Sequence, residues 1–163
     1  MKRLLIVFHS MTGGARQMAE AVLHGATSES AIKAQLLRAP DARPEDVLQA
    51  DGYVFVTPEN LAAIAGLMKD FFDRTYYAAL DRIAGRPYAT LVCAGSDGQN
   101  AVRQIERICT GWRLKPVCEP IIVCTHAQTP EAILAPKTIG AEDLRRCEEI
   151  GAAIAAGLAL GVF

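Results

Sequence analysis

Short apolar runs alternate along the chain with longer segments that carry an apolar residue every three or four positions. The runs have the length of buried strands, and the periodic segments have the spacing of amphipathic helices. Strands separated by helices are joined by crossover connections, which make the strands parallel in one sheet. The alternation therefore predicts a three-layer α/β fold, with helices on both faces of a five-stranded parallel sheet. Expected strands cover residues 3–8, 31–37, 52–56, 86–94 and 117–124, and expected helices cover residues 15–24, 44–49, 60–77, 101–110 and 141–160.

The composition and net charge of the chain limit the classes of protein to which it can belong. Residues 1–163 contain no repeat, low-complexity segment or linker, so we expect a single domain. The net charge is −1, from 17 basic and 18 acidic residues without a run of either sign, which gives no sign of binding to nucleic acid or to an anionic membrane. The five cysteines are odd in number and form no Cys-x-x-Cys pair, so neither a disulfide framework nor a zinc site is indicated. Reduced thiols in the cytoplasm are the simplest expectation.

Both ends of the chain are apolar, but neither has the pattern of a membrane segment. The apolar start ends at His9-Ser10 without a small-residue cleavage site, which favours a first strand over a signal peptide. The stretch from Ile150 to Phe163 is 14 residues long, whereas a spanning helix needs about 20. We expect this tail to be a buried helix or a contact between subunits.

Three loops rich in small and hydrogen-bonding residues follow the first, third and fourth expected strands. They are Ser10–Gln17, Thr57–Leu61 and Gly95–Asn100. Because parallel strands point the same way, the three loops emerge along one edge of the sheet, where α/β proteins bind their ligands. The combination predicts a ligand site at that edge.

The first loop has the features of a phosphate site. It lies between a buried strand and a helix N-terminus, where unpaired N–H groups and the helix dipole favour an anion and the Gly13-Gly14 pair permits close approach. Ser10 and Thr12 add hydroxyl groups. The spacing matches neither a Walker A loop nor the Gly-x-Gly-x-x-Gly of dinucleotide-binding folds. ATP and a conventional NAD site are therefore disfavoured.

The sequence Ser10-Met-Thr-Gly-Gly-Ala-Arg resembles the Ser/Thr-x-Thr-Gly-x-Thr phosphate loop of flavodoxins and of flavodoxin-like NAD(P)H-dependent FMN reductases. Thr57-Pro58-Glu59-Asn60 resembles the Thr-Pro-Glu/Thr loop of the reductases, and Gly95–Gly98 corresponds to their glycine-rich loop. The resemblance covers nearly the whole chain and implies a flavodoxin-like fold, with strand order 2-1-3-4-5, that binds flavin mononucleotide (FMN). It implies an FMN phosphate held by Ser10, Met11, Thr12, Gly13, Gly14, Ala15, Arg16 and Gln17, and ribityl and ring contacts from Thr57, Pro58, Glu59, Asn60, Leu61, Gly95, Ser96, Asp97 and Gly98.

Two residue differences separate this chain from that pattern. Ala15 replaces the last threonine of the phosphate loop and removes a hydroxyl, although Arg16 can supply charge. The ring-contacting loops lack the Trp or Tyr that electron-carrier flavodoxins commonly stack on the flavin. An open flavin face would suit a second substrate.

Several residues near the expected site have two interpretations. The Gly13-Gly14 pair is explained by a ligand or by a tight turn alone. Glu59 and Asp97 are flavin contacts or ordinary exposed acids. His9 and Cys93 lie at strand ends beside the site, but packed side chains are the commoner role for such residues. Trp112 lines a cleft or packs in the core.

The resemblance implies an FMN-dependent oxidoreductase that uses NAD(P)H to reduce a quinone-like, nitro or similar small-molecule acceptor. The flavin would carry the chemistry, so no protein residue is expected to be catalytic and no metal is expected. The alternatives are a single-electron carrier between proteins and a flavin-free binding module. Because similar reductases often assemble as dimers or tetramers, the resemblance also leads us to expect a homodimer or homotetramer. No arginine cluster that could be assigned to the 2′-phosphate of NADPH is evident in the sequence.

Overall fold

The strands of the computed structural model, which describes residues 1–163, form one sheet in the order β2-β1-β3-β5, with β6 and β7 both on the outer edge of β5. All of these pairings are parallel, and only β4 pairs in antiparallel fashion, with β3. The expected order 2-1-3-4-5 is confirmed. The strands are β1 (Lys2–Phe8), β2 (Ile32–Arg38), β3 (Gly52–Asn60), β4 (Ala63–Ile64), β5 (Pro87–Ala94), β6 (Lys115–Pro116) and β7 (Ile121–Cys124).

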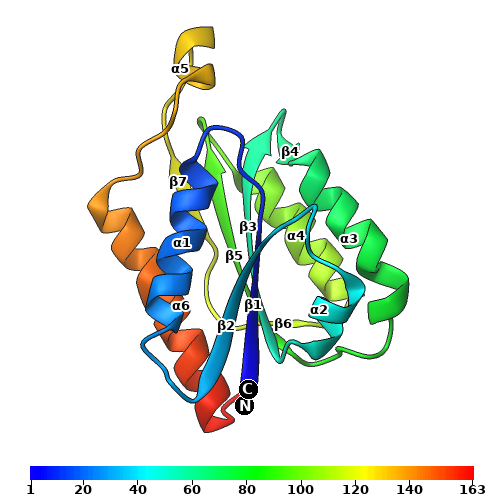
Figure 1. Ribbon diagram of the computed structural model, residues 1–163. Helices are drawn as coiled ribbons and strands as arrows, with labels where there is room; N and C mark the ends of the chain where they lie inside the picture. The colour runs from blue at the N-terminus through cyan, green and yellow to red at the C-terminus, as the bar shows by residue number, and fades with distance from the viewer.

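Helices cover both faces of this sheet, as the alternating pattern predicts (Figure 1). α1 (Gly14–Ala26) and α6 (Ala141–Leu160) lie together on one face. α2 (Pro44–Gln49), α3 (Gly66–Ala79) and α4 (Gln99–Gly111) lie on the other. The short α5 (Pro130–Leu134) projects beyond the edge where the strands end.

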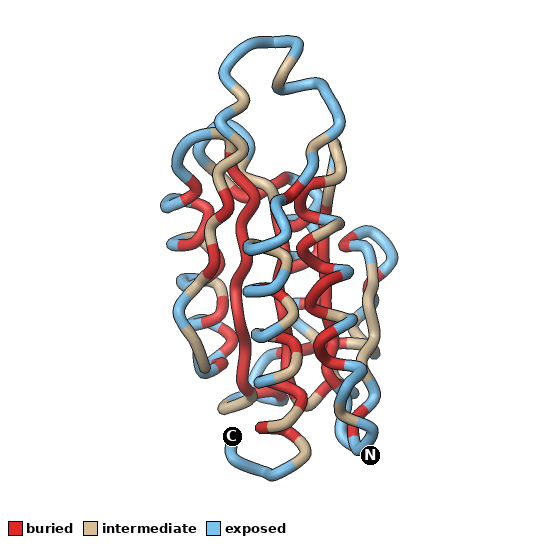
Figure 2. The backbone as a smooth tube through the Cα atoms, turned by 90° about the vertical axis from the view of Figure 1, so that its left-hand side faces the viewer, coloured by how far each residue is buried: buried red, intermediate tan, exposed pale blue.

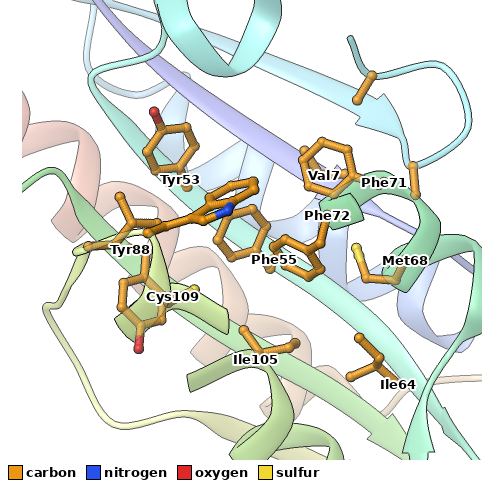
Figure 3. Close-up of a cluster of buried hydrophobic side chains, with 14 of the residues drawn as sticks. Val7, Tyr53, Phe55, Ile64, Met68, Phe71, Phe72, Tyr88, Ile105 and Cys109 are labelled. Atoms are coloured by element: carbon orange, nitrogen blue, oxygen red, sulfur yellow. The ribbon is translucent and has the colours of Figure 1, made fainter. Parts of the chain in front are cut away.

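Each face of the sheet has its own hydrophobic core, because side chains alternate between the faces along every strand. The core on the α1/α6 side is aliphatic except for Phe8, whereas the core on the α3/α4 side contains a cluster of aromatic rings. Phe55 lies at the centre of the aromatic core, with its ring centroid 5.0 Å from Phe72 and 6.4 Å from Trp112 (Figure 3). Trp112 is therefore a core residue and does not line a cleft. Figure 2 shows the central strands buried almost throughout, in contrast to the exposed segment around α5.

The third strand is longer than expected, because the prediction that Pro58 ends it is wrong. The carbonyl of Val56 accepts a hydrogen bond from the N–H of His9, so the backbone of Val56 faces β1. Pro58, two positions later, has the same orientation, but β1 has already ended at Phe8. The missing N–H of proline is therefore not needed there.

The segment after β3 is a β-hairpin, where the sequence pattern predicts the start of a helix. Leu61 and Ala62 form its turn with φ of 50° and 59°, and α3 begins only at Gly66. The expected fifth strand is likewise divided into β6 and β7, because Pro116 and Pro120 bracket a stretch that leaves the sheet. α5 has no counterpart among the expected helices.

The apolar C-terminal stretch is explained largely by packing within the chain. Ile154, Ala155 and Leu158 on α6 are buried against the sheet and α1, whereas Leu160 and Val162 are exposed. No helix has both the length and the apolar character needed to cross a membrane.

Candidate functional site

The three predicted loops meet at the carboxyl edge of the sheet (Figure 1). The first connects β1 to α1, the second is the hairpin between β3 and β4, and the third connects β5 to α4. α1 and α4 therefore both point their N-termini at this edge. The structure thus brings together the loops that the sequence predicts to form one site.

The first loop presents free backbone donors at the start of α1. Gly13 has φ of 96°, in the left-handed region that favours glycine, and its own N–H is satisfied by the Ser10 hydroxyl at 3.0 Å. The N–H groups of the next three residues, Gly14, Ala15 and Arg16, have no hydrogen-bond partner in the chain. No side chain caps the helix, and its first turn contains no acidic residue. Such a helix start is a ready site for an anion.

Two side chains add to this group of donors. The Thr12 hydroxyl makes no hydrogen bond within the chain. The Arg16 guanidinium lies near Gly13 and reaches its nearest acid, Glu20, only at 4.0 Å. Unpaired N–H groups, a free hydroxyl and a lightly paired cation are the donors that a phosphate monoester requires. The residues present therefore fit the FMN phosphate, although Ala15 offers only its N–H.

Gln17 supports the loop from the side through three hydrogen bonds of its side chain. Its Nε2 donates to the carbonyls of Gly13 at 2.9 Å and Lys137 at 2.7 Å, and its Oε1 accepts from the N–H of Ile139 at 3.1 Å. The N–H of Lys137 also donates to the Thr12 carbonyl at 2.8 Å. Residues 137–139 thus brace the loop, a role that the sequence does not signal because they lie 120 residues further along the chain.

Gly14 is required because β5 approaches the start of α1 closely. A Cβ at this position would lie 2.6 Å from the Cys93 sulfur. Burial raises the pKa of the Cys93 thiol to about 11, so this group is protonated near neutral pH. Cys93 therefore packs under the phosphate loop as a neutral side chain.

Glu59 joins the second loop to the third through its carboxylate, whose two oxygens accept hydrogen bonds from α4. Its Oε1 accepts from the N–H of Gly98 at 2.9 Å and its Oε2 from the N–H of Ala101 at 3.3 Å, which caps the N-terminus of α4. Two further bonds fasten the hairpin to the same helix. Asn100 donates to the Ala62 carbonyl, and the Gln104 side chain accepts from the N–H of Ile64.

Two other polar residues at this edge serve the fold. The buried Thr57 hydroxyl donates to the Pro58 carbonyl at 3.0 Å and accepts from the N–H of Ala65 at 3.3 Å. His9 is buried at the end of β1, and burial, with the charge of Arg38, lowers its pKa from the usual 6.5. His9 is therefore neutral at physiological pH and is not set up as a general acid.

The rim of the site is formed by residues that remain exposed. Met11 and Leu61 present apolar side chains to solvent, and Asn60, Ser96 and Asp97 present polar ones. The Asp97 carboxylate makes one long contact, with the N–H of Gln99 at 3.4 Å. No aromatic side chain lies in any of the three loops. The structure contains no group of three or more His, Cys, Asp or Glu placed to hold a metal ion.

A comparison with models of protein families identifies the family of this chain. The model of the family described as NADPH-dependent FMN reductase matches residues 38–129, more than half of the chain. The chain belongs to the NADPH-dependent FMN reductase family. The matched range contains the hairpin loop and the Gly95–Gly98 loop, while the phosphate loop lies before it.

The chain is also similar in sequence to individual flavin-related proteins over part of its length. The chain is 35% identical over 95 residues to an NAD(P)H dehydrogenase (quinone) of Acidithiobacillus ferrooxidans, an alignment that covers 46% of this chain and 48% of that protein. It is 37% identical over 73 residues to a flavodoxin of Aquifex aeolicus, which covers 45% of this chain and 40% of that one. The chain therefore spans about half, or less, of the length of these relatives.

Solved structures confirm the flavodoxin-like fold. A flavodoxin from the domain Archaea matches 96% of this chain and 98% of its own with a TM-score of 0.78 at 19% identity. A WrbA-like flavodoxin from Agrobacterium tumefaciens matches 99% of both chains with a TM-score of 0.72 at 18% identity. The expected fold class is therefore correct over nearly the whole chain.

Proposed function

We propose that this chain is an FMN-dependent oxidoreductase that uses NAD(P)H to reduce a quinone-type small molecule. The observation that carries the proposal is the start of α1, where three adjacent N–H groups lack partners at a helix without a cap. Membership of the NADPH-dependent FMN reductase family and the similarity to NAD(P)H dehydrogenases (quinone) support the choice of cofactor and reaction.

The chain's own contribution is binding and orientation. The N–H groups of Gly14, Ala15 and Arg16, together with the Thr12 hydroxyl, would hold the phosphate. The hairpin and the Gly95–Gly98 loop would border the flavin ring, held in fixed relation by Glu59. When bound, FMN supplies the redox chemistry by accepting hydride and passing electrons to the acceptor.

No side chain at this edge is prepared for covalent or acid catalysis. Cys93 is a buried thiol with a raised pKa, and His9 is buried with a lowered one. The exposed apolar side chains of Met11 and Leu61, with no aromatic residue covering the edge, leave room for a flat second substrate. This arrangement favours an enzyme that turns over small molecules.

The direct experiment is to load the purified protein with FMN, remove excess flavin, and follow NADPH and NADH consumption with a benzoquinone present. Steady oxidation that depends on the loaded protein, and exceeds that of free FMN at the same concentration, is the expected result. No turnover at saturating concentrations of both substrates would overturn the proposed reaction.

An electron carrier is the second candidate, because the chain is similar to the Aquifex flavodoxin. A carrier predicts FMN binding without steady NADPH oxidation, so the same assay separates the two functions. The near-neutral net charge of −1 favours the enzyme, since carriers usually surround the flavin with acidic residues. The homodimer or homotetramer and the cytoplasmic location stay predictions, to be checked by mass in solution and by fractionation of cells.

A further inference from the structure

A groove between α3 and α4 is lined by three cationic side chains, two of which have no partner in the chain. It has a volume of about 560 Å³, within the range of small-molecule sites. Lys69 on α3 and Arg103 and Arg107 on α4 line it, and no acidic side chain does. The sequence does not reveal this group, because Lys69 is 34 positions from Arg103 and only the helix packing brings the two side chains to one groove.

The two arginines lack partners within the protein. Neither guanidinium makes an ion pair or a hydrogen bond in the chain, whereas Lys69 is bonded to Asp73 at 2.7 Å. Arg103 and Arg107 are four residues apart on one helix, a spacing at which like charges destabilise the helix. Two unpaired cations that share one wall of a cavity are suited to an anionic ligand that neutralises both.

The groove lies directly beside the candidate flavin site. Its lining includes Ile64 of the hairpin and Asn100 of the first turn of α4. Asn100 also bonds to the Ala62 carbonyl, and Glu59 pairs with Ile64 in the hairpin and caps α4. With a rise of about 1.5 Å per residue, Arg103 and Arg107 lie roughly 5 and 10 Å further along α4 than Asn100. A ligand bound at the flavin ring would therefore meet them by extending over the hairpin.

We propose that this groove binds the 2′-phosphate of NADPH and makes the chain prefer NADPH to NADH. The inference rests on the proposed function, which brings a nicotinamide to the flavin ring. The 2′-phosphate is a terminal, doubly charged group near neutral pH, and arginine forks match phosphate oxygens with paired hydrogen bonds. NADH lacks this phosphate and would leave Arg103 and Arg107 unpaired.

The first test is a binding experiment that needs no turnover. 2′-AMP and 5′-AMP are titrated by calorimetry into the FMN-loaded protein, and into its R103Q/R107Q variant. The expected result is saturable binding of 2′-AMP that is at least about tenfold tighter than that of 5′-AMP and falls by about tenfold to a hundredfold in the variant. R82Q, which removes an exposed arginine elsewhere with no side-chain partner, is the matched control and should bind like the wild type.

Equal or absent binding of the two nucleotides, or binding that R103Q/R107Q leaves unchanged, would overturn the assignment. The second test compares KM for NADPH and for NADH in the same proteins. The double variant should raise KM for NADPH by about tenfold or more, while KM for NADH changes less than about twofold. If the protein oxidises NADPH but 2′-AMP does not bind to the groove, the inference fails and the proposed function stands. If 2′-AMP binds as expected but no NADPH is oxidised, the proposed reaction fails instead.

Discussion

The Glu59 carboxylate accepts the N–H of Gly98 at 2.9 Å, and this bond links the hairpin after β3 to the start of α4. Gly98 is in the left-handed region, with φ of 87°, so its N–H is turned toward the hairpin as the helix begins. A second bond from the N–H of Ala101 completes the cap. The Glu59 side chain thus links two of the three loops at the candidate site, together with the bonds of Asn100 and Gln104 to the same hairpin.

Replacing Glu59 tests this link. Glu59→Ala leaves two helix N–H groups without their acceptor, so we expect the free energy of unfolding to fall by about 1–2 kcal/mol. We also expect FMN to bind up to about tenfold more weakly, because the ring loops lose their fixed relation. Urea unfolding and flavin titration measure the two effects. Glu119→Ala, at an exposed glutamate without a partner, should change neither, and an equal effect of both variants would contradict the assignment.

The close approach of Gly14 to Cys93 predicts that the effect of Gly14→Ala on stability depends on which residue occupies position 93. Gly14→Ala places a Cβ 2.6 Å from the Cys93 sulfur, so we expect a loss of about 1–3 kcal/mol in stability. Removing the sulfur with Cys93→Ala relieves the clash, and alanine is then preferred to glycine in a helix by up to about 1 kcal/mol. In that background Gly14→Ala should be neutral or stabilising. A double-mutant cycle by urea unfolding measures the coupling, and the same cost in both backgrounds would show that the contact does not matter.

The hairpin turn stores backbone strain beside the site. Leu61 and Ala62 both have positive φ, which costs an L-residue about 1–2 kcal/mol, and the exposed Leu61 side chain recovers nothing from the core. Ala62→Gly should therefore raise the free energy of unfolding by about 0.5–1 kcal/mol. The neighbouring Ala63 is in a strand, so Ala63→Gly should have the opposite sign. Thermal unfolding of the Ala62→Gly and Ala63→Gly variants measures both changes in stability. If both variants shifted stability in the same direction, the turn would not be strained.

Burial of His9 predicts a pH dependence of stability. Its pKa in the folded protein is below the usual 6.5, chiefly because of burial, so the unfolded chain binds the proton more readily. The contribution of neutral His9 to stability is therefore complete above pH 6.5. It is lost as the pH falls from 6.5 through the lower pKa of the folded protein, by at most about 1.4 kcal/mol per pH unit. His9→Gln should flatten this part of the profile of urea unfolding. His126→Gln, at an exposed histidine whose side chain has no partner, serves as the control, and identical profiles for His9→Gln and the wild type would refute the prediction.

The sequence pattern was sufficient for the layers, the strand order and the position of the site. β1 is apolar and buried from Leu4 to Phe8 and β5 is buried throughout, and the loops that follow them must meet at one edge. The errors lie where a local signal was ambiguous. A proline usually ends a strand, but at Pro58 the neighbouring strand ends first. The two turn residues of the hairpin, Leu61 and Ala62, are neither glycine nor asparagine, so nothing in the sequence reveals a turn with positive φ.

The long-range contacts of the site could not be read from the sequence. Glu59 as a helix cap, Gln17 as a bridge to Lys137, and Arg103 beside Lys69 all depend on which elements pack together. Spacing along the chain carries no information about such pairs. The same side chains could have been flavin contacts or exposed charges, and only their partners in the fold separate these roles.

The most direct test of the central claim compares FMN with riboflavin, which has the same ring but no phosphate. Each flavin is titrated into the flavin-free protein while flavin fluorescence is followed. The free N–H groups of Gly14, Ala15 and Arg16 predict saturable binding of FMN at least about tenfold tighter than that of riboflavin. Equal affinities for the two flavins, or no saturable binding of FMN, would contradict a phosphate site at the start of α1.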